Sequence, residues 1–301
     1  MVTPEKEKIN YMTTNQYSIA ILLPTRGRTA ALSRSVISLF NRAVNPKSIQ
    51  LLLAFDNDDD IGRDHFKNEL EPWLIEKDIA YMAMEFEPVG YIRLNEYFNA
   101  LAINADADWL MTWNDDAIMD SAGWDRVITA HTGQFKLLAL HTHNDHPYSI
   151  FPIIPKAWID VTKHYSPHQM IDAWVSQQAY MLDIFKRIDV WATHDRHDLT
   201  GNNTDSTFEA RVALEGHLDT PGDFHHMATV NLRIVETENI ANYMKSVGID
   251  TTWWENVKLG DQYPWAKLKE NDTNKQMAQF VVDTPLDTVH PLLAGAVKYK
   301  V

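Results

Sequence analysis

Residues 18–28, Ser-Ile-Ala-Ile-Leu-Leu-Pro-Thr-Arg-Gly-Arg, decide the fold class of this 301-residue chain. The run up to Leu23 is apolar without the alternation of a one-sided strand, which is typical of a strand buried on both faces. Pro24 ends the run, and Thr25–Arg28 supplies a polar loop. Apolar residues at helical spacing follow over 30–43. The stretch therefore predicts a buried parallel strand, a loop and a helix.

The same order of strand, loop and helix repeats downstream. Such alternation is typical of an open, mostly parallel sheet, in which ligands bind beyond the carboxyl ends of the strands. Three strand ends carry polar residues: Thr25–Arg28, Asp56–Asp60 and Asn114–Asp116. We therefore expect one site assembled from these three ends. The expected elements are a strand over 49–55, a helix over 63–77, a strand over 79–86, a helix from Gly90, and a strand over 108–113.

The pattern is more mixed beyond Trp124. The main α/β domain is expected to span 18–230, after a flexible leader over 1–17 and before a small, helical and Trp-rich C-terminal extension over 231–301. Further elements are expected as a strand over 136–141, an apolar segment over 151–154, a helix over 171–184, a strand over 188–192, a polar loop over 194–205 and a helix over 240–247.

Composition limits the chemistry and the partners. Lys and Arg total 27 against 41 Asp and Glu, for a formal net charge of −14, so the surface as a whole should repel phosphate backbones and anionic membranes. A local basic groove remains open. The sequence has no cysteine, so any metal must be held by carboxylate, imidazole or carbonyl groups. No apolar run approaches the ~18 residues that span a bilayer, and we expect a cytoplasmic protein without membrane insertion.

Several segments together resemble a known enzyme family. In their order and spacing over residues 18–210, they are similar to glycosyltransferases of the GT-A fold, especially the family-2-like group of inverting enzymes. The resemblance implies a Rossmann-like, GT-A type sheet flanked by helices. It also implies transfer of a hexosyl or pentosyl group from a nucleoside diphosphate sugar to an acceptor hydroxyl. The segments are Pro24–Arg28, Asp56, Ala117–Asp125 and Phe151–Trp158.

The acidic cluster Asn114-Asp115-Asp116 is the predicted metal site. A leaving diphosphate needs a hard cation, and carboxylate oxygens at a strand end bind Mg²⁺ or Mn²⁺. The resemblance implies that Asp116 is the metal ligand, as the last acid of an Asp-X-Asp motif. Asn114 replaces the first acid, which in the family often faces the donor's ribose. The structural alternative is a solvated turn, in which Asp residues cap neighbouring elements.

Donor-binding residues are predicted on the same strand ends. Arg26 and Arg28 suit diphosphate oxygens, and their structural alternative is to offset neighbouring acids. The resemblance assigns Asp56 to the donor's base, whereas Asp58–Asp60 are expected to be a surface acidic run. Arg93 and Asn95 resemble a helix that lines the donor pocket, or else form an exposed helix face. The complete predicted set is Pro24, Thr25, Arg26, Arg28, Asp56, Arg93, Asn95, Asn114 and Asp115.

Asp172 and His194 complete the predicted site. The resemblance implies that Asp172, at the start of a helix, is the general base that takes the acceptor's proton. Its alternative role is helix capping. His194 follows a strand, as does the histidine that completes metal coordination in many GT-A enzymes, and His197 is the second candidate. Either could instead be an ordinary surface histidine. A loop over 200–206 could close over the donor and exclude water.

Two other functions compete with sugar transfer. His141-Thr142-His143-Asn144-Asp145-His146 fits the H-x-H-x-D-H pattern of metallo-β-lactamase-like hydrolases, whose catalysis uses bound metals. A catalytically silent module that binds a sugar or nucleotide is the third possibility. For the transferase, the expected donor is a UDP-sugar. The acceptor is a glycan, a small molecule or a hydroxylated DNA base, the last of these if the chain is encoded by a bacteriophage and works in the host cytoplasm.

Overall fold

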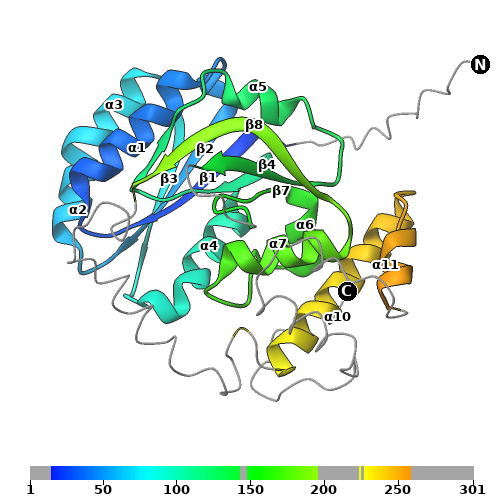
Figure 1. The fold of residues 1–301 in the computed structure, drawn as a ribbon. Helices are drawn as coiled ribbons and strands as arrows, with labels where there is room; N and C mark the ends of the chain where they lie inside the picture. The colour runs from blue at the N-terminus through cyan, green and yellow to red at the C-terminus, as the bar shows by residue number, and fades with distance from the viewer. Residues whose placement is uncertain (1–14, 143–147, 196–223, 225–226, 259–301) are drawn as a thin grey trace, which may run out of the picture.

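One eight-stranded sheet runs through the protein, with helices on both faces (Figure 1). The computed structural model describes residues 15–142, 148–195, 224 and 227–258. The strand order is β3-β2-β1-β4-β7-β6-β8-β5. The strands are β1 (Tyr17–Thr25), β2 (Ile49–Asp56), β3 (Ala80–Phe86), β4 (Ala107–Thr112), β5 (Ala117–Met119), β6 (Leu137–Thr142), β7 (Ile153–Pro155) and β8 (Phe185–His194).

The first four strands form the predicted parallel unit. β1 pairs parallel with β2 and with β4, and β2 pairs parallel with β3. The register aligns Leu22 with Leu52 and with Thr112, so all these strands point their carboxyl ends to the same edge. β6 and β8 are also parallel. The predicted α/β class with a mostly parallel sheet is therefore confirmed.

Two short strands run against this direction and were not predicted as such. β7 lies between β4 and β6 and is antiparallel to both. β5 forms the far edge and is antiparallel to β8.

β1 also continues one residue past Pro24, which was expected to end it. Proline has no N–H to donate to a neighbouring strand. The β1–β4 pairing ends at Leu22, so on that side no hydrogen bond from residue 24 is needed.

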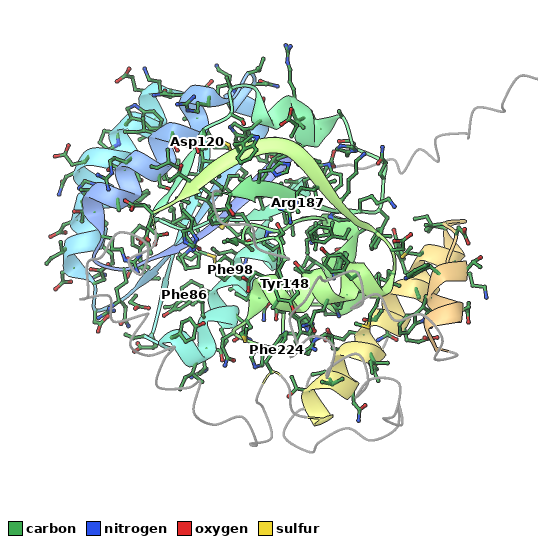
Figure 2. The ribbon with its side chains drawn as sticks, in the orientation of Figure 1. Phe86, Phe98, Asp120, Tyr148, Arg187 and Phe224 are labelled. Atoms are coloured by element: carbon green, nitrogen blue, oxygen red, sulfur yellow. The ribbon has the colours of Figure 1, made fainter. Side chains whose placement is uncertain are left out.

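Two apolar cores fill the faces of the sheet. The core on one face receives Leu39 of α1, Leu74 of α3 and Trp124 of α5. The other receives buried residues of α4, α6, α7, α10 and α11, and Phe98 and Phe224 lie on this side in Figure 2. The helical elements are α1 (Thr29–Arg42), η1 (Pro46–Ser48), α2 (Asp60–His65), η2 (Phe66–Leu70), α3 (Glu71–Glu76), η3 (Tyr91–Arg93), α4 (Leu94–Asn104), α5 (Trp124–Thr129), α6 (Lys156–Thr162), α7 (Ile171–Met181), α10 (Met227–Ser246) and α11 (Thr252–Lys258).

The C-terminal helix α10 begins well before the residue at which sequence periodicity places it. It starts at Met227 rather than near 240, and crosses the division expected at residue 230. Its residues Leu232, Ile240 and Met244 are buried in the same core as α6 and α7. Of the polar loop expected over 194–205, only His194 and Asp195 fall within the described residues. No helix in the described part of the chain is long and apolar enough to cross a bilayer.

A buried carboxylate fastens α10 to α7. His164 Nε2 lies 2.6 Å from Glu236 Oε1, while Trp174 Nε1 and Gln178 Nε2 donate to Glu236 Oε2 at 2.9 and 3.0 Å. Glu236 is 5 % exposed, so these partners replace the water that the carboxylate loses on folding. Arg233 extends the contact, because its guanidinium packs over the rings of Trp174 and Phe224.

Replacing Glu236 with Ala is expected to lower the free energy of unfolding by about 3 kcal/mol or more, because several buried polar groups lose their partner together. Urea denaturation measures the loss. The matched control is Glu238→Ala on the same helix, which removes the bond from Trp254 Nε1 at a partly buried position and should cost about 1 kcal/mol. Equal losses for the two variants would contradict the role given to the Glu236 network.

Candidate functional site

The carboxyl ends of β1, β2 and β4 bring three polar segments to one edge of the sheet. β1 lies between β2 and β4 and is parallel to both. Thr25 ends β1, Asp56 ends β2, and Asn114 lies just beyond β4. Side-chain hydrogen bonds connect the three segments across this edge. The structure therefore brings together the strand ends on which the predicted site depends.

Asp115 ties the loop after β1 to the segment after β4. Its Oδ2 accepts a hydrogen bond from Thr25 Oγ1 at 2.7 Å, and its Oδ1 accepts one from Arg28 Nη1 at 3.1 Å. Asp115 is buried, so both partners offset the cost of removing its charge from water. Thr25, Arg28 and Asp115, all predicted to bind the donor, form one connected unit.

Asp116 lies beside His194, its predicted partner in metal binding. β5 pairs antiparallel with β8, with Ala117 opposite His194, and Asp195 N donates to Asp116 O at 2.9 Å. His194 Nε2 is consequently 3.2 Å from Asp116 Oδ1, while Arg28 Nη1 donates to Oδ2 at 3.1 Å. Burial acts to raise the pKa of Asp116, but His194 and Arg28 outweigh it, so the pKa lies below its usual value. Asp116 is therefore ionised at neutral pH.

One oxygen of Asp116 is suited to a cation. Although Oδ1 is close to His194, it is buried and receives no hydrogen bond within the described residues. Asn114 Nδ2 contacts His194 Nε2 at 3.1 Å. In the neutral histidine whose Nε2 is unprotonated, Nε2 accepts this hydrogen bond. A cation beside Asp116 Oδ1 would take the Nε2 lone pair in place of the Asn114 hydrogen. Ligands at right angles around a small divalent ion lie ~3 Å apart, given metal–ligand distances of about 2.1 Å, which matches the Asp116–His194 separation.

The protein alone supplies an incomplete coordination shell. Among the residues that the structure describes, no group of three Asp, Glu or His side chains is placed to hold a metal ion. Mg²⁺ commonly binds to one or two carboxylates and takes its other ligands from water and substrate phosphates. Asp116 fits that pattern as the single carboxylate, and His194 adds a nitrogen ligand. The second histidine candidate, His197, lies outside the described residues.

Asp56, the carboxylate predicted to face the donor's base, is held at both oxygens. Tyr97 donates its hydroxyl hydrogen to Oδ1, and Arg26 Nη1 donates to Oδ2 at 2.7 Å. The same guanidinium also pairs with Asp58. Burial, together with the bond to Asp56, raises the pKa of Tyr97 to about 12. The hydroxyl is therefore protonated at neutral pH and acts as a donor.

Asp59 differs from the surface role expected for the acidic run after β2. It is buried, and its Oδ2 accepts a hydrogen bond from Gly27 N at 2.8 Å while Oδ1 accepts one from Gly62 N at 3.1 Å. Gly27 has φ +68°, a conformation that glycine adopts without strain. Asp58 and Asp60 are exposed and pair with Arg26 and Arg63, respectively. One member of the run thus shapes the loop after β1.

Three predicted site residues contact parts of the protein other than the three strand ends: Arg93, Asn95 and Asp172. Arg93 is exposed and pairs with Glu96, its neighbour one turn later. Asn95 Nδ2 donates to Ser166 O at 3.3 Å, which connects α4 to the loop before α7. Asp172 is half-buried in the first turn of α7, and its Oδ1 accepts a hydrogen bond from Ala173 N at 2.8 Å. Their predicted roles toward donor and acceptor stay predictions.

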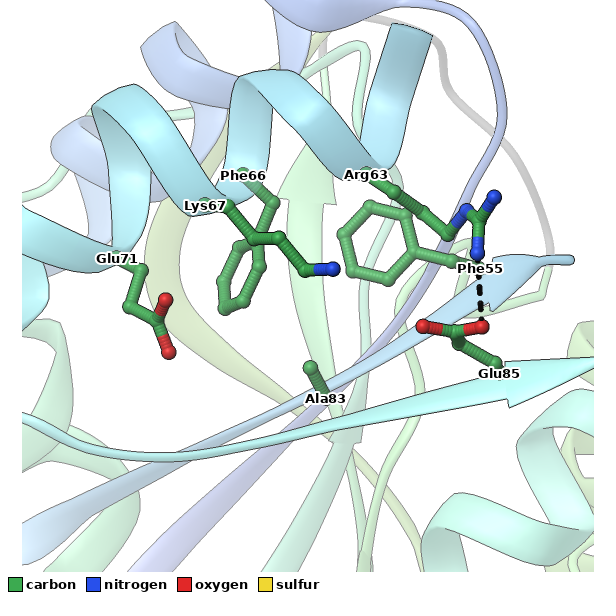
Figure 3. A pocket seen from close by; sticks show the side chains of 7 residues that line it. All are labelled: Phe55, Arg63, Phe66, Lys67, Glu71, Ala83 and Glu85. Atoms are coloured by element: carbon green, nitrogen blue, oxygen red, sulfur yellow. Dashed lines mark hydrogen bonds and ion pairs between the residues drawn. The ribbon is translucent and has the colours of Figure 1, made fainter. Parts of the chain in front are cut away.

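A pocket of about 210 Å³ lies on the face of the sheet that α2 and η2 cover (Figure 3). Phe55 and Phe66 provide apolar surface, and Arg63 Nη1 donates to Glu85 Oε2 at 2.9 Å within it. None of the predicted site residues lines it. The remaining lining residues are Lys67, Glu71 and Ala83.

Two residues at the site were not singled out from the sequence. Ser35 is fully buried on α1, where it accepts from Trp113 Nε1 at 2.8 Å and donates to Asn114 O at 2.9 Å. Tyr97 lies among the apolar positions of α4. A tyrosine at such a position needs a partner for its hydroxyl, which is the signal that could have identified it.

The competing H-x-H-x-D-H motif is described only at its start. His141 lies in β6, next to its last residue Thr142. Its ring stacks on Trp191 with 4.6 Å between centroids. His143, Asp145 and His146 lie outside the described residues. His194, the predicted metal ligand of the transferase, lies next to Asp116.

Solved structures with a similar fold were found. A mannosyltransferase, PcManGT, from Pyrobaculum calidifontis in complex with GDP-Man and Mn²⁺ matches 90 % of this chain and 86 % of its own, with TM-score 0.52 and 8 % identity. Residues 1–349 of S. aureus TarS in complex with UDP-GlcNAc match 94 % of this chain and 88 % of their own, with TM-score 0.53 and 12 % identity. No protein-family model and no curated protein matches the sequence. The chain has a GT-A-like glycosyltransferase fold.

Proposed function

We propose that this protein transfers a sugar from a nucleoside diphosphate sugar to an acceptor hydroxyl, with Mn²⁺ or Mg²⁺ bound by Asp116 and His194. The observation that carries the proposal is the 3.2 Å separation between His194 Nε2 and the buried Oδ1 of Asp116, which receives no hydrogen bond within the described residues. This pair lies at the strand ends where such sheets bind ligands. The complexes of the two structural neighbours, with GDP-Man and Mn²⁺ and with UDP-GlcNAc, support the choice of donor class.

The donor occupies the edge formed by the three strand ends, and a UDP-sugar is the first choice. Asp56 receives the base, Asn114 the ribose, and Arg28 the diphosphate, for which its guanidinium is suited. Arg26 is the second diphosphate contact, because its half-exposed side chain can leave Asp56. The catalytic unit spans residues 18–230 and the extension 231–301, and α10 crosses this division and packs on α6 and α7.

Asp172 is proposed as the general base of an inverting transfer. The acceptor oxygen forms a bond to the anomeric carbon as the bond from that carbon to the diphosphate breaks, and Asp172 takes the hydroxyl proton. When bound, the metal ion offsets the negative charge that develops on the leaving diphosphate. Support for Asp172 comes from its position in the first turn of α7, where it is partly exposed.

The acceptor is a glycan, a small molecule or a hydroxylated base in DNA. The net charge of −14 disfavours broad contact with a phosphate backbone and leaves a short or locally bound acceptor. A bacteriophage origin, with action in the host cytoplasm, fits the last of these acceptors. A labelled UDP-sugar incubated separately with glycans, small hydroxylated compounds and hydroxymethylated DNA would separate the three.

Calorimetry with UDP and GDP, each with and without Mn²⁺, tests the proposed function. We expect binding of UDP that weakens at least about tenfold without metal, because the diphosphate completes the coordination of the ion. Binding of equal strength without metal would favour a silent nucleotide-binding module. Two equivalents of bound zinc that are lost in His143→Ala would favour the hydrolase.

A further inference from the structure

The Tyr97 hydroxyl has a fixed direction. Tyr97 is buried on α4, and its ring packs edge-on against Phe86 with 5.2 Å between centroids. Val89 N donates to the hydroxyl oxygen at 3.1 Å. Because a backbone N–H can only donate, the hydroxyl hydrogen is left for Asp56, and it is directed to Oδ1. The inner oxygen of Asp56 is therefore held from inside the protein.

The outer oxygen of Asp56 has a partner that can leave. Oδ2 accepts from Arg26, whose side chain is 53 % exposed, whereas the Asp56 side chain is only 9 % exposed. Arg26 has a second carboxylate, Asp58, to which both of its terminal nitrogens donate. Arg26 can therefore break its bond to Asp56 Oδ2 and keep its ion pair with Asp58. Tyr97, with its ring packed and its oxygen bonded on both sides, has no such freedom.

We propose that Tyr97 is a positioning residue that selects the base of the donor. By holding Oδ1, Tyr97 turns Oδ2 toward the base, where Oδ2 accepts a ring N–H once Arg26 has moved. This assignment rests on the proposed sugar transfer. Uracil and guanine carry a ring N–H beside a carbonyl, whereas cytosine and adenine have an accepting lone pair at that place. A carboxylate fixed in this way favours the first two bases, because it repels an acceptor.

Nucleotide affinities of Tyr97→Phe test the assignment. The variant keeps the ring and removes only the hydroxyl, so Asp56 can rotate. We expect the Kd for UDP to rise about tenfold, which corresponds to the loss of one hydrogen bond to a charged group, and the Kd for CDP to change less than twofold. kcat at saturating donor should be unchanged. Tyr81→Phe is the matched control, because it removes a hydroxyl that donates to Glu71 at 2.6 Å, away from Asp56 and the other strand ends of the proposed site. It should leave both affinities unchanged.

A double-mutant cycle with Asp56→Asn separates positioning from a general structural effect. If Tyr97 acts through Asp56, the Tyr97→Phe change costs little UDP affinity once Asp56→Asn is present. Additive losses, or equal losses for UDP and CDP, would overturn the assignment. Binding of UDP that Tyr97→Phe leaves intact would overturn only the role of Tyr97. Failure of the unmodified protein to bind any nucleoside diphosphate would overturn the sugar transfer itself and this role with it.

Discussion

Asp116→Asn is expected to abolish Mn²⁺-dependent binding of UDP and to lower the transfer rate about a thousandfold or more. The amide keeps the shape of the side chain but loses the charge that a divalent ion needs, and metal stabilisation of a leaving group contributes several kcal/mol, each 1.36 kcal/mol being tenfold in rate. Arg28 retains its bond to Asp115 in this variant, so no buried cation is left unpaired. Calorimetry of UDP with Mn²⁺ and release of UDP from a UDP-sugar measure the two effects.

The matched control is Asp60→Asn, which changes an exposed acid at the start of α2 whose side chain pairs with Arg63. It should leave metal-dependent binding and rate within about twofold, as surface ion pairs contribute little. His194→Gln should also reduce the Mn²⁺ dependence of UDP binding. Metal-dependent UDP binding that survives in both Asp116→Asn and His194→Gln would place the cation elsewhere.

Asp172→Asn is expected to lower kcat by a factor of about 10² to 10⁴ while leaving the Kd for UDP unchanged. An amide accepts no proton, and a positioned general base contributes an acceleration of this size. The rigid attachment of α7 to α10 through Trp174 and Glu236 keeps the first turn of α7 in place in the variant. Initial rates at saturating donor and acceptor, with UDP binding measured in parallel, provide the comparison.

Asp160→Asn is the control for Asp172→Asn. Asp160 is an exposed acid on α6 that pairs with Lys156, and its loss should not change kcat measurably. If Asp172→Asn instead lowered UDP affinity and left kcat at saturation unchanged, Asp172 would be a donor contact rather than the base.

The parallel half of the fold was predictable because its signals are local. Each of β1, β2 and β4 is an apolar run that ends in polar residues, and the helix between two such runs is readable from spacing. The convergence of Thr25, Asp56 and Asn114 follows from sheet topology alone. The antiparallel insertion of β7 has no local signal, because its three residues pair with β4 and β6, which both precede it, and β5 and α5 lie between those two strands in the chain.

Buried polar residues account for two errors of the sequence-based prediction, the start of α10 and the exposure of Asp59. α10 carries Arg233 and Glu236 at positions that face α7, and in a sequence such residues read as a solvated face although here they are almost fully buried. Asp59 was likewise predicted to be on the surface, because it lies within an acidic run. A polar side chain can occupy the core when a distant residue supplies its hydrogen bond, and that residue is not identifiable from spacing.

The pairing of β5 with β8 has a consequence for how the protein folds. Asn114 and His194 are eighty residues apart in the chain, and Thr25 and Asp115, which join β1 to the segment after β4, are ninety apart. Both closures are non-local, and such pairings form slowly. The pair of Asp116 and His194 is therefore expected to form late in refolding, when the sheet closes. An ion that binds only the finished pair stabilises the native state by mass action. Mn²⁺ should then slow unfolding without speeding the early folding phase.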